Sequence, residues 1–166
     1  MSDLIELKEV VYNVRARNGV WCTHPYYNHP WGCPNFPKCI KKYTDFSVVA
    51  DQYKWYAVTE SFDLKSHAKM MKEKLPHWTE RQCRNPLYWQ GSVRKRLLNK
   101  ALAVGGNVVL TIPEACGVNV FETMSKVGII LERKPDTVIK VMLVGFSLDP
   151  IPGRTYDGRS KFITVG

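Results

Sequence analysis

The sequence predicts an α+β or α/β fold: a single domain in which one mixed sheet is packed by helices. Three stretches, residues 53–59, 107–112 and 138–148, are rich in β-branched, aromatic or aliphatic residues, as buried strands are. Two others, residues 62–75 and 92–104, place apolar residues at helical spacing. These patterns alternate along 166 residues, the length of one domain, which predicts helices packed around one sheet.

An irregular segment divides the first half of the chain. Residues 1–20 indicate a strand or a short helix. Residues 21–42 contain four prolines, which exclude a regular helix or a central strand, so we expect an irregular loop there. The strand at residues 53–59 is followed by an amphipathic helix that Pro76 ends. One face of that helix carries Leu64, Ala68, Met71 and Leu75.

The middle of the chain carries a second, more basic helix. Pro86 divides residues 79–103, and the helix predicted over residues 92–104 ends at Gly105 and Gly106, which favour a C-cap. Its inward positions are expected to be Val93, Leu97, Leu98, Ala101 and Leu102.

The last helix and strand close the predicted domain. Asn119 followed by Glu122 is typical of a capping box that opens a helix. The strand at residues 138–148 follows it. We therefore expect one domain over residues 1–150 and a flexible basic C-terminal tail over residues 151–166.

Charge and hydropathy limit the classes of partner. The chain has 24 Lys and Arg against 15 Asp and Glu, a formal net charge of +9, which favours a polyanion such as a nucleic acid or nucleotide. Acidic residues interrupt the first eleven positions, so no signal-peptide core is expected there. No stretch approaches the roughly 20 apolar residues of a membrane span. We expect a cytoplasmic protein without a membrane partner, whose five cysteines are not paired in disulfides.

The loop at residues 21–42 concentrates metal ligands. Cys22, Cys33 and Cys39 lie close together in the sequence, and thiolates are the preferred ligands of iron–sulfur clusters and structural zinc. A proline-bent backbone can direct three thiolates at one centre, and a bound metal would order such a long loop. Nearby aromatic residues would shield the centre from water. They are Trp21, Tyr26, Tyr27, Trp31 and Phe36.

The spacing of these cysteines favours an iron–sulfur cluster of the 4Fe-4S type. It contains no Cys-x2-Cys pair of the kind found in zinc ribbons, and Cys33 is followed by Pro34, as is common around clusters. Zinc stays open as the alternative, because His24 and His29 can complete a tetrahedral site. A further interpretation also stays open, in which the cysteines are reduced and pack separately as small hydrophobic side chains.

Two other cysteines lie outside this loop. Cys116 precedes the helix expected at Asn119, where the N-terminal N–H groups of a helix stabilise a thiolate. It is the candidate fourth ligand or a reactive thiol facing the cluster, and the alternative is a turn cysteine that packs under the helix. Cys83 is expected to be a partly buried helix residue. The predicted metal ligands are therefore Cys22, Cys33, Cys39 and Cys116.

Four segments occur in a distinctive order: Cys22, GCPNFPKC at residues 32–39, KWYAVTES at residues 54–61 and PEACGVNVFETMSKVGI at residues 113–129. Together they resemble a widespread prokaryotic family of cysteine-rich, predicted metal-binding proteins of unknown function. The resemblance covers roughly residues 20–146 and implies metal binding, without naming a reaction. Typical members carry further cysteines before the EACG-like segment, where this chain has VVLTIP, so the resemblance implies a single site.

A stretch at residues 78–100 combines cations with aromatic rings. Cations contact phosphates and rings stack on bases, so this stretch is a candidate contact for a nucleic acid or nucleotide. We favour the alternative of a solvated basic face over a core, because no signature of a nucleic-acid-binding fold is present. The candidate contacts are Arg81, Arg84, Tyr88, Trp89, Arg94 and Lys95.

The sequence thus predicts an iron–sulfur-cluster-binding protein. Whether it is an enzyme stays open. A cluster with only three cysteine ligands would leave one iron free to act on a nucleotide or a nucleic-acid-derived substrate. The alternatives are a zinc-stabilised nucleic-acid-binding module and an electron-transfer protein. The sequence has none of the common phosphate-loop, dinucleotide, zinc-protease or serine-hydrolase motifs, so no catalytic residue is assigned.

Overall fold

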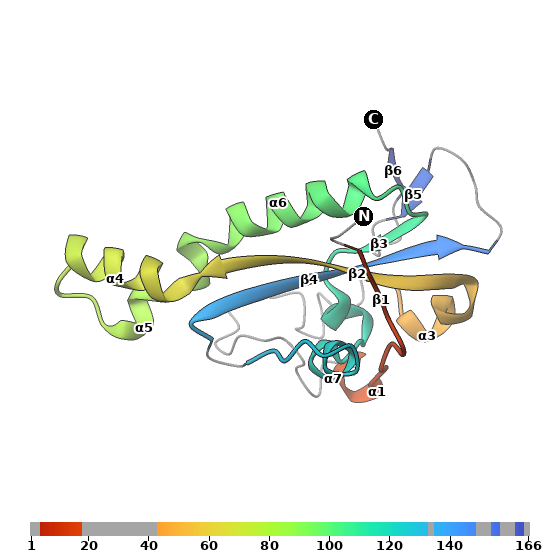
Figure 1. Cartoon of the computed structure of the whole chain (residues 1–166), viewed down its shortest axis with the longest axis horizontal. Helices are drawn as coiled ribbons and strands as arrows, with labels where there is room; N and C mark the ends of the chain where they lie inside the picture. The colour runs from red at the N-terminus through yellow and green to blue at the C-terminus, as the bar shows by residue number, and fades with distance from the viewer. Residues whose placement is uncertain (1–3, 18–42, 133–134, 149–153, 157–161, 165–166) are drawn as a thin grey trace.

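In the computed structural model of the chain, the described residues are 4–17, 43–132, 135–148, 154–156 and 162–164. They form one sheet with helices on both faces (Figure 1), which confirms the predicted α+β fold with a mixed sheet. The sheet is elongated because its two longest strands have 11 residues each.

Six strands lie in the order β1-β2-β4-β3-β5-β6. β2 (Tyr53–Asp63) and β4 (Thr137–Ser147) pair antiparallel along their whole lengths. β1 (Leu4–Glu6) pairs with the outer edge of β2, and β3 (Val108–Leu110) pairs with the other edge of β4. The pairing of β3 with β4 ends at Leu110↔Leu143, so the first half of β4 extends beyond β3.

The sheet is mixed because β5 (Arg154–Tyr156) runs parallel to β3, while β6 (Phe162–Thr164) runs antiparallel to β5. Both strands fall within residues 151–166, where the sequence predicts a flexible tail. In the structure β5 pairs with β3 at Tyr156, and β6 pairs with β5, so residues 154–156 and 162–164 are strand residues. The basic, glycine-containing composition of this segment gives no indication of such strand pairing.

One face of the sheet is covered by the long helix α6 (Gln90–Ala103), as Figure 1 shows. At one end of the molecule, α4 (Leu64–Lys74) continues directly from β2, and α5 (Glu80–Cys83) packs against it. The 3-10 turn η2 (Pro86–Tyr88) then leads into α6.

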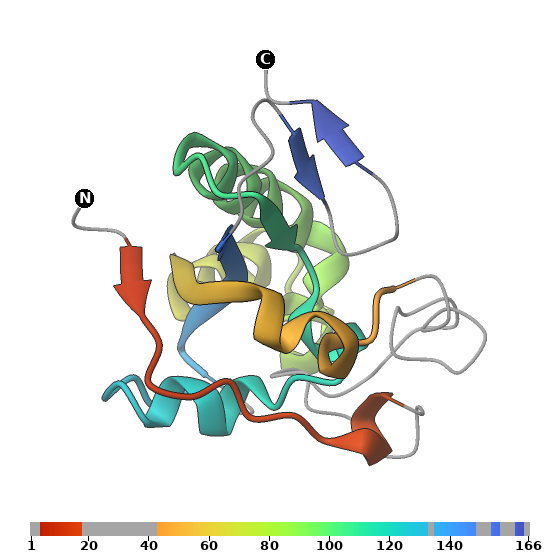
Figure 2. The ribbon, with the colours of Figure 1, turned by 90° about the vertical axis from the view of Figure 1, so that its right-hand side faces the viewer.

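The opposite face carries several short helices, which lie away from α6 in both views (Figures 1 and 2). They are α1 (Val14–Arg17), α3 (Phe46–Val49), the 3-10 turns η1 (Ala50–Gln52) and η3 (Pro113–Cys116), and α7 (Val120–Ser125).

Side-chain caps explain where two of the helices begin. Asp63 accepts a hydrogen bond from the Ser66 N–H at 3.0 Å, so α4 begins at Leu64 and β2 extends past the strand predicted over residues 53–59. Asn119 accepts from the Glu122 N–H at 3.1 Å and donates its amide N–H to the Glu122 carboxylate at 3.3 Å. The predicted helix start at Asn119 is therefore confirmed.

The two faces of the sheet bury separate hydrophobic cores. Alternation along β4 sends Met142 and Val144 toward α6, and Val141 and Leu143 toward η3 and α7. The core on the α6 side includes Val58, Leu97, Ala101, Val109, Met142 and Val144. The larger core on the other side includes Phe46, Trp55, Leu110, Cys116, Val118, Met124 and Leu143.

Candidate functional site

Cys116 lies at the end of η3, on the face of the sheet opposite α6, and its side chain is fully buried. Pro113 begins this turn and Gly117 ends it in the left-handed region, with φ of +94°. A Cβ at position 117 would lie 2.6 Å from Tyr12 Cε1 and 2.9 Å from Arg17 Cβ. Glycine is therefore required both by its backbone angle and by the close packing of the N-terminal segment.

Backbone pairing fixes this turn against the N-terminal segment. The Asn13 N–H donates to the Gly117 carbonyl at 2.7 Å, and the Asn119 N–H donates to the Val11 carbonyl at 2.7 Å. Tyr12 and Val118 form an antiparallel bridge between these two bonds. The turn that carries Cys116 is therefore held rigidly beside residues 11–13.

Arg17 joins three parts of the chain next to Cys116. Its guanidinium donates to the Tyr43 carbonyl at 2.8 Å and to the Ala115 carbonyl at 3.4 Å. Its Nε lies 3.8 Å from the Asp45 carboxylate, and its side chain is largely buried. Arg17 and Tyr43 flank residues 18–42, so both flanks of the cysteine-rich segment are anchored at the turn that carries Cys116.

Asp45 and Tyr12 complete the polar contacts around this anchor. Burial raises the pKa of Asp45, but hydrogen bonds from Ser47 and Tyr12 and the charge of Arg17 outweigh that effect and hold the pKa below its ordinary value of 3.8. Burial and the hydrogen bond to Asp45 raise the pKa of Tyr12. At neutral pH the anchor therefore joins an ionised carboxylate to a guanidinium.

The predicted ligands Cys22, Cys33 and Cys39, with His24 and His29, lie outside the described residues. Within the part of the chain that the structure describes, no three side chains of the metal-binding types form a group. Their convergence with Cys116 therefore stays a prediction. Cys83 lies at the end of α5, as a helix residue was expected to, but it is fully buried and not partly buried.

The candidate contacts at residues 81–89 are placed in different environments. Trp89 is buried, stacks on Phe62 at 5.0 Å between ring centroids, and donates its indole N–H to the Arg84 carbonyl. Its ring is therefore part of the core and cannot stack on a base. The favoured alternative of a basic face over a core, which expected Leu87, Trp89 and Leu97 inside, agrees with the burial of Trp89 and Leu97, whereas Leu87 is 79% exposed.

Arg84 is occupied by protein contacts, whereas Arg81 and Tyr88 are exposed. Arg84 contacts Glu80 at 2.7 Å and Asp136 at 3.0 Å, and its hydrogen bond to Glu80 raises its pKa despite partial burial. Tyr88 packs its ring against Trp78 at 5.2 Å between centroids and is 51% exposed. Of these two rings, Tyr88 is the more accessible to a ligand.

The remaining two candidates, Arg94 and Lys95, are neighbours on α6 but differ in exposure. Lys95 is on the exposed side of the helix, whereas Arg94 is half-buried beside the sheet. Arg94 lines a small cavity of about 40 Å³ together with Glu114 and Lys140. From the sequence, Glu114 was a possible acid or base without a pairing group, and Lys140 had no expected role, although a lysine within the apolar strand VIKVMLVGF signals an unusual position.

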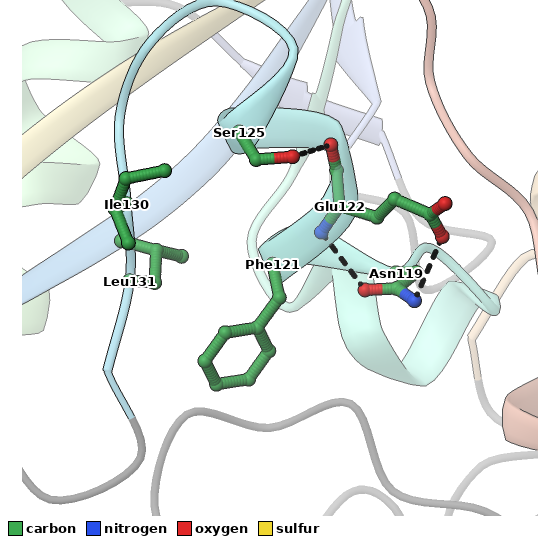
Figure 3. A pocket seen from close by; sticks show the side chains of 6 residues that line it. All are labelled: Asn119, Phe121, Glu122, Ser125, Ile130 and Leu131. Atoms are coloured by element: carbon green, nitrogen blue, oxygen red, sulfur yellow. Dashed lines mark hydrogen bonds between the residues drawn. The ribbon is translucent and has the colours of Figure 1, made fainter.

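A larger hollow of about 410 Å³ lies beside α7 (Figure 3). Its apolar wall consists of Phe121, Ile130 and Leu131. Two of its polar residues, Asn119 and Glu122, are joined by the capping hydrogen bonds of α7, so their polar groups stabilise the helix start. These hydrogen bonds explain the two polar residues by their role in capping α7, so we assign no binding or catalytic role to the hollow.

No helix in the described part of the chain combines the length and hydropathy needed to cross a bilayer. No family model, no curated protein and no solved structure matches this chain.

Proposed function

We propose that this protein binds an iron–sulfur cluster through Cys22, Cys33 and Cys39, with Cys116 as the fourth ligand or as a thiol beside the cluster. The observation that supports this proposal is the anchor around Arg17. It fixes the residues on both sides of the cysteine-rich segment to the carbonyl of Ala115, the residue directly before Cys116.

Covalent geometry limits how far two of the thiols can lie from this anchor. Cys22 follows Arg17 by five residues, so a fully extended chain would separate them by at most about 18 Å. Cys39 precedes Tyr43 by four residues, which gives a limit of about 14 Å. Both thiols are therefore within reach of the same turn, and Cys116 is the cysteine that the turn carries.

The surroundings of Cys116 suit a cluster ligand. The side chain is fully buried in an apolar core, and exclusion of water slows cluster loss and tunes its potential. When bound, a cluster with one open iron supplies a Lewis acid, and a cluster with four protein ligands supplies electron transfer. The reducing cytoplasm, the compartment we propose, keeps such thiols available.

Elemental analysis of protein purified without oxygen tests this proposal. We expect iron and sulfide near four of each per chain for a 4Fe-4S cluster, with a broad visible absorption band. Cys116→Ser should lower the iron content or shorten the lifetime of the cluster in air. Cys83→Ser is the matched control, because Cys83 is equally buried but lies on α5. Colourless wild-type protein without iron would reject the proposal.

Zinc is the alternative occupant of the same thiols. Zinc with little iron in the purified protein, and unfolding on addition of a chelator, would favour a structural site that His24 or His29 completes. Retention of the fold after complete removal of zinc would argue against that alternative.

A second function, binding of nucleic acid, is favoured by the distribution of charge. The basic segment, residues 64–103, holds ten Lys and Arg against two Glu, so it carries +8 of the net charge of +9. It comprises α4, α5, η2 and α6, and α6 itself has no acidic residue. Lys65, Lys69, Lys74 and Lys95 are exposed and form no ion pair with a described residue. We propose that this surface contacts the phosphates of a nucleic acid.

The salt dependence of binding tests this surface. For wild-type protein and single-stranded oligonucleotides, the logarithm of the affinity should fall linearly with the logarithm of the salt concentration. Lys95→Gln should make that slope shallower by about 0.7, the loss of one phosphate contact on a single strand. Lys126→Gln, beside α7 and paired with Glu9, is the control and should leave the slope unchanged. Equal slopes for both variants would exclude α6 from the contact.

A further inference from the structure

Two exposed apolar side chains, Leu87 and Tyr88, are neighbours in η2, the turn between α5 and α6. Leu87 is 79% exposed and Tyr88 is 51% exposed. They belong to the helical end of the molecule, residues 64–89, where α4 and α5 extend past the sheet (Figure 1). An exposed apolar patch that polar residues surround is typical of a binding surface.

The backbone holds these two residues in a fixed turn. Pro86 opens η2 with a restricted φ, and the Asn85 side-chain oxygen accepts from the Leu87 N–H at 3.0 Å. The Asn85 carbonyl accepts from the Tyr88 N–H at 3.2 Å. The next residue, Trp89, is buried. A ligand that binds Tyr88 therefore has little backbone freedom left to remove, which favours affinity.

The ring of Tyr88 is supported by a second ring and keeps an exposed surface. Its centroid lies 5.2 Å from that of Trp78, and the two planes are inclined by 48°. The tilted contact orients Tyr88 and leaves about half of the residue accessible. A fixed aromatic ring with an accessible surface can stack on a nucleobase of any sequence, because every base has a π-face.

Positive charge lies beside this pair of rings. Lys72 on α4 donates a hydrogen bond to the Trp78 carbonyl and forms no ion pair with a described residue. The helical end as a whole holds six Lys and Arg against two Glu. Phosphates carry negative charge along the backbone of a nucleic acid, so the strand that supplies the base is attracted to the same place. Rings combined with cations are typical of sites for single strands.

The size of the patch favours a base over a protein partner. A stable protein interface buries about 800 Å² on each partner, far more than two exposed apolar side chains supply. One ring is sufficient for one base. In a duplex, neighbouring base pairs cover the faces of each internal base, whereas an unpaired base presents its face to an aromatic side chain.

We propose that Tyr88 stacks on an unpaired base of a single-stranded nucleic acid, with Leu87 in apolar contact with the strand and Lys72 beside its phosphates. This inference rests on the proposed nucleic-acid surface and adds the class of substrate, a single strand. Stacking releases no counterions, so its contribution to affinity is separable from that of the lysines by its independence of salt.

Titration of a labelled oligothymidylate with the full-length protein, followed by fluorescence anisotropy, tests the proposal. Tyr88→Ala should weaken binding at least about fivefold at every salt concentration and leave the salt slope unchanged. Tyr88→Phe keeps the ring and should bind as wild type does. Leu148→Ala removes an equally exposed side chain at the opposite end of β4, so it is the control and should also bind as wild type does.

A closed duplex without free ends separates the classes of substrate, because Tyr88→Ala should leave its affinity unchanged. The inference is overturned, and the basic surface stands, if wild type binds with the expected salt dependence and Tyr88→Ala binds the single strand equally well. Equal losses in Tyr88→Ala and Tyr88→Phe, or equal losses for the single strand and the duplex, would also overturn it. Self-association that Leu87→Ala abolishes would assign the patch to a second copy of the chain. No binding by wild type would overturn both proposals.

Discussion

On the face of the sheet that packs against η3 and α7, the buried side chains are mostly apolar, with Glu114, Asn119 and Thr123 as the polar exceptions, and the thiol of Cys116 lies among them. On the face that α6 covers, the same strands bury Lys140 and half-bury Glu60 beside the cations of the helix. Both faces come from one pair of strands, β2 and β4, whose side chains alternate between them.

This difference separates two kinds of candidate site. A mostly apolar environment excludes water from a thiol and therefore suits a bound metal centre. The face that α6 covers carries the buried Lys140 and the ion pairs of Glu60, so changes of charge should act there. Substitutions that change packing should therefore lower the free energy of unfolding most on the face of Cys116. Substitutions that remove a charge should have their effect on the face of α6.

The largest effect is expected from Leu110→Ala, on the face of Cys116. Leu110 is fully buried among apolar neighbours, so the substitution should lower the free energy of unfolding by about 4 kcal/mol. Leu97→Ala on α6 is the comparison and should cost less, since the polar cavity beside Leu97 lets water enter the new space. Denaturant unfolding measures both free energies. Equal losses would show that water enters neither new space more easily than the other.

A slightly smaller effect is expected from Gly117→Ala. The new methyl would require a left-handed alanine and would overlap the Tyr12 ring, which together should cost about 3 kcal/mol. Gly128→Ala is the matched control, because Gly128 has a similar φ of +86° but nothing within 4 Å of a Cβ. Its cost should be about 1 kcal/mol. Equal costs in thermal or denaturant unfolding would contradict tight packing of the N-terminal segment on η3.

Arg17→Gln tests the anchor beside Cys116. It removes the hydrogen bonds to Tyr43 and Ala115 and the ion pair with Asp45, and should lower the free energy of unfolding by about 2 kcal/mol. Arg15→Gln, on the exposed surface of α1, is the control and should be nearly neutral. Under the metal proposal, Arg17→Gln should also lose iron faster than Arg15→Gln. Equal iron retention in the two variants would show that the contacts of Arg17 do not support the metal site.

The smallest effect is expected from Glu60→Gln, on the face of α6. Burial raises the pKa of Glu60, but Lys100 and Arg96 outweigh it and lower the pKa below its ordinary value of 4.5. The stabilisation from the carboxylate is therefore complete above that value and is lost as the pH falls through the lower pKa of the folded state. We expect wild type to exceed Glu60→Gln by about 1 kcal/mol at neutral pH, a modest value because Arg96 is half exposed.

The pH dependence supplies the control for that prediction. The difference in unfolding free energy between wild type and Glu60→Gln should shrink as the pH falls below the ordinary value of 4.5 and through the lower pKa of the folded state, because the carboxylate becomes protonated. A difference that does not change with pH would show that the amide disturbs packing and that the ion pairs contribute nothing.

Local patterns made several elements predictable from the sequence. The capping residues Asn119 and Glu122 mark the start of α7, and the apolar stripe of Val93 and Leu97 marks the inner side of α6. These predictions succeed because a cap or a helical stripe depends on residues three or four positions apart. The predicted bounds of β2 and α4 differ from the observed bounds, because the pairing of β2 with all of β4 extends the strand to Asp63.

The candidate sites depend on contacts between distant residues, which local patterns do not contain. Arg17 meets Ala115 and Tyr43, and Arg94, Glu114 and Lys140 come to line one cavity, only after the sheet has formed. Trp89 is different, because its helical spacing with Val93 and Leu97 is a local pattern that favours burial, and the structure buries it against Phe62.

The sequence alone determined the class of fold, the positions of most strands and helices, the concentration of thiols at residues 22–39 and the excess of positive charge between residues 64 and 103. Those properties follow from the order of residue types along the chain. The tertiary structure alone decided that Cys116 lies beside the anchored flanks of the thiol-rich segment, and that Lys140, Arg94 and Glu114 line one cavity. The physical reason is that strand pairing and sheet packing, and not sequence neighbours, set which distant side chains meet.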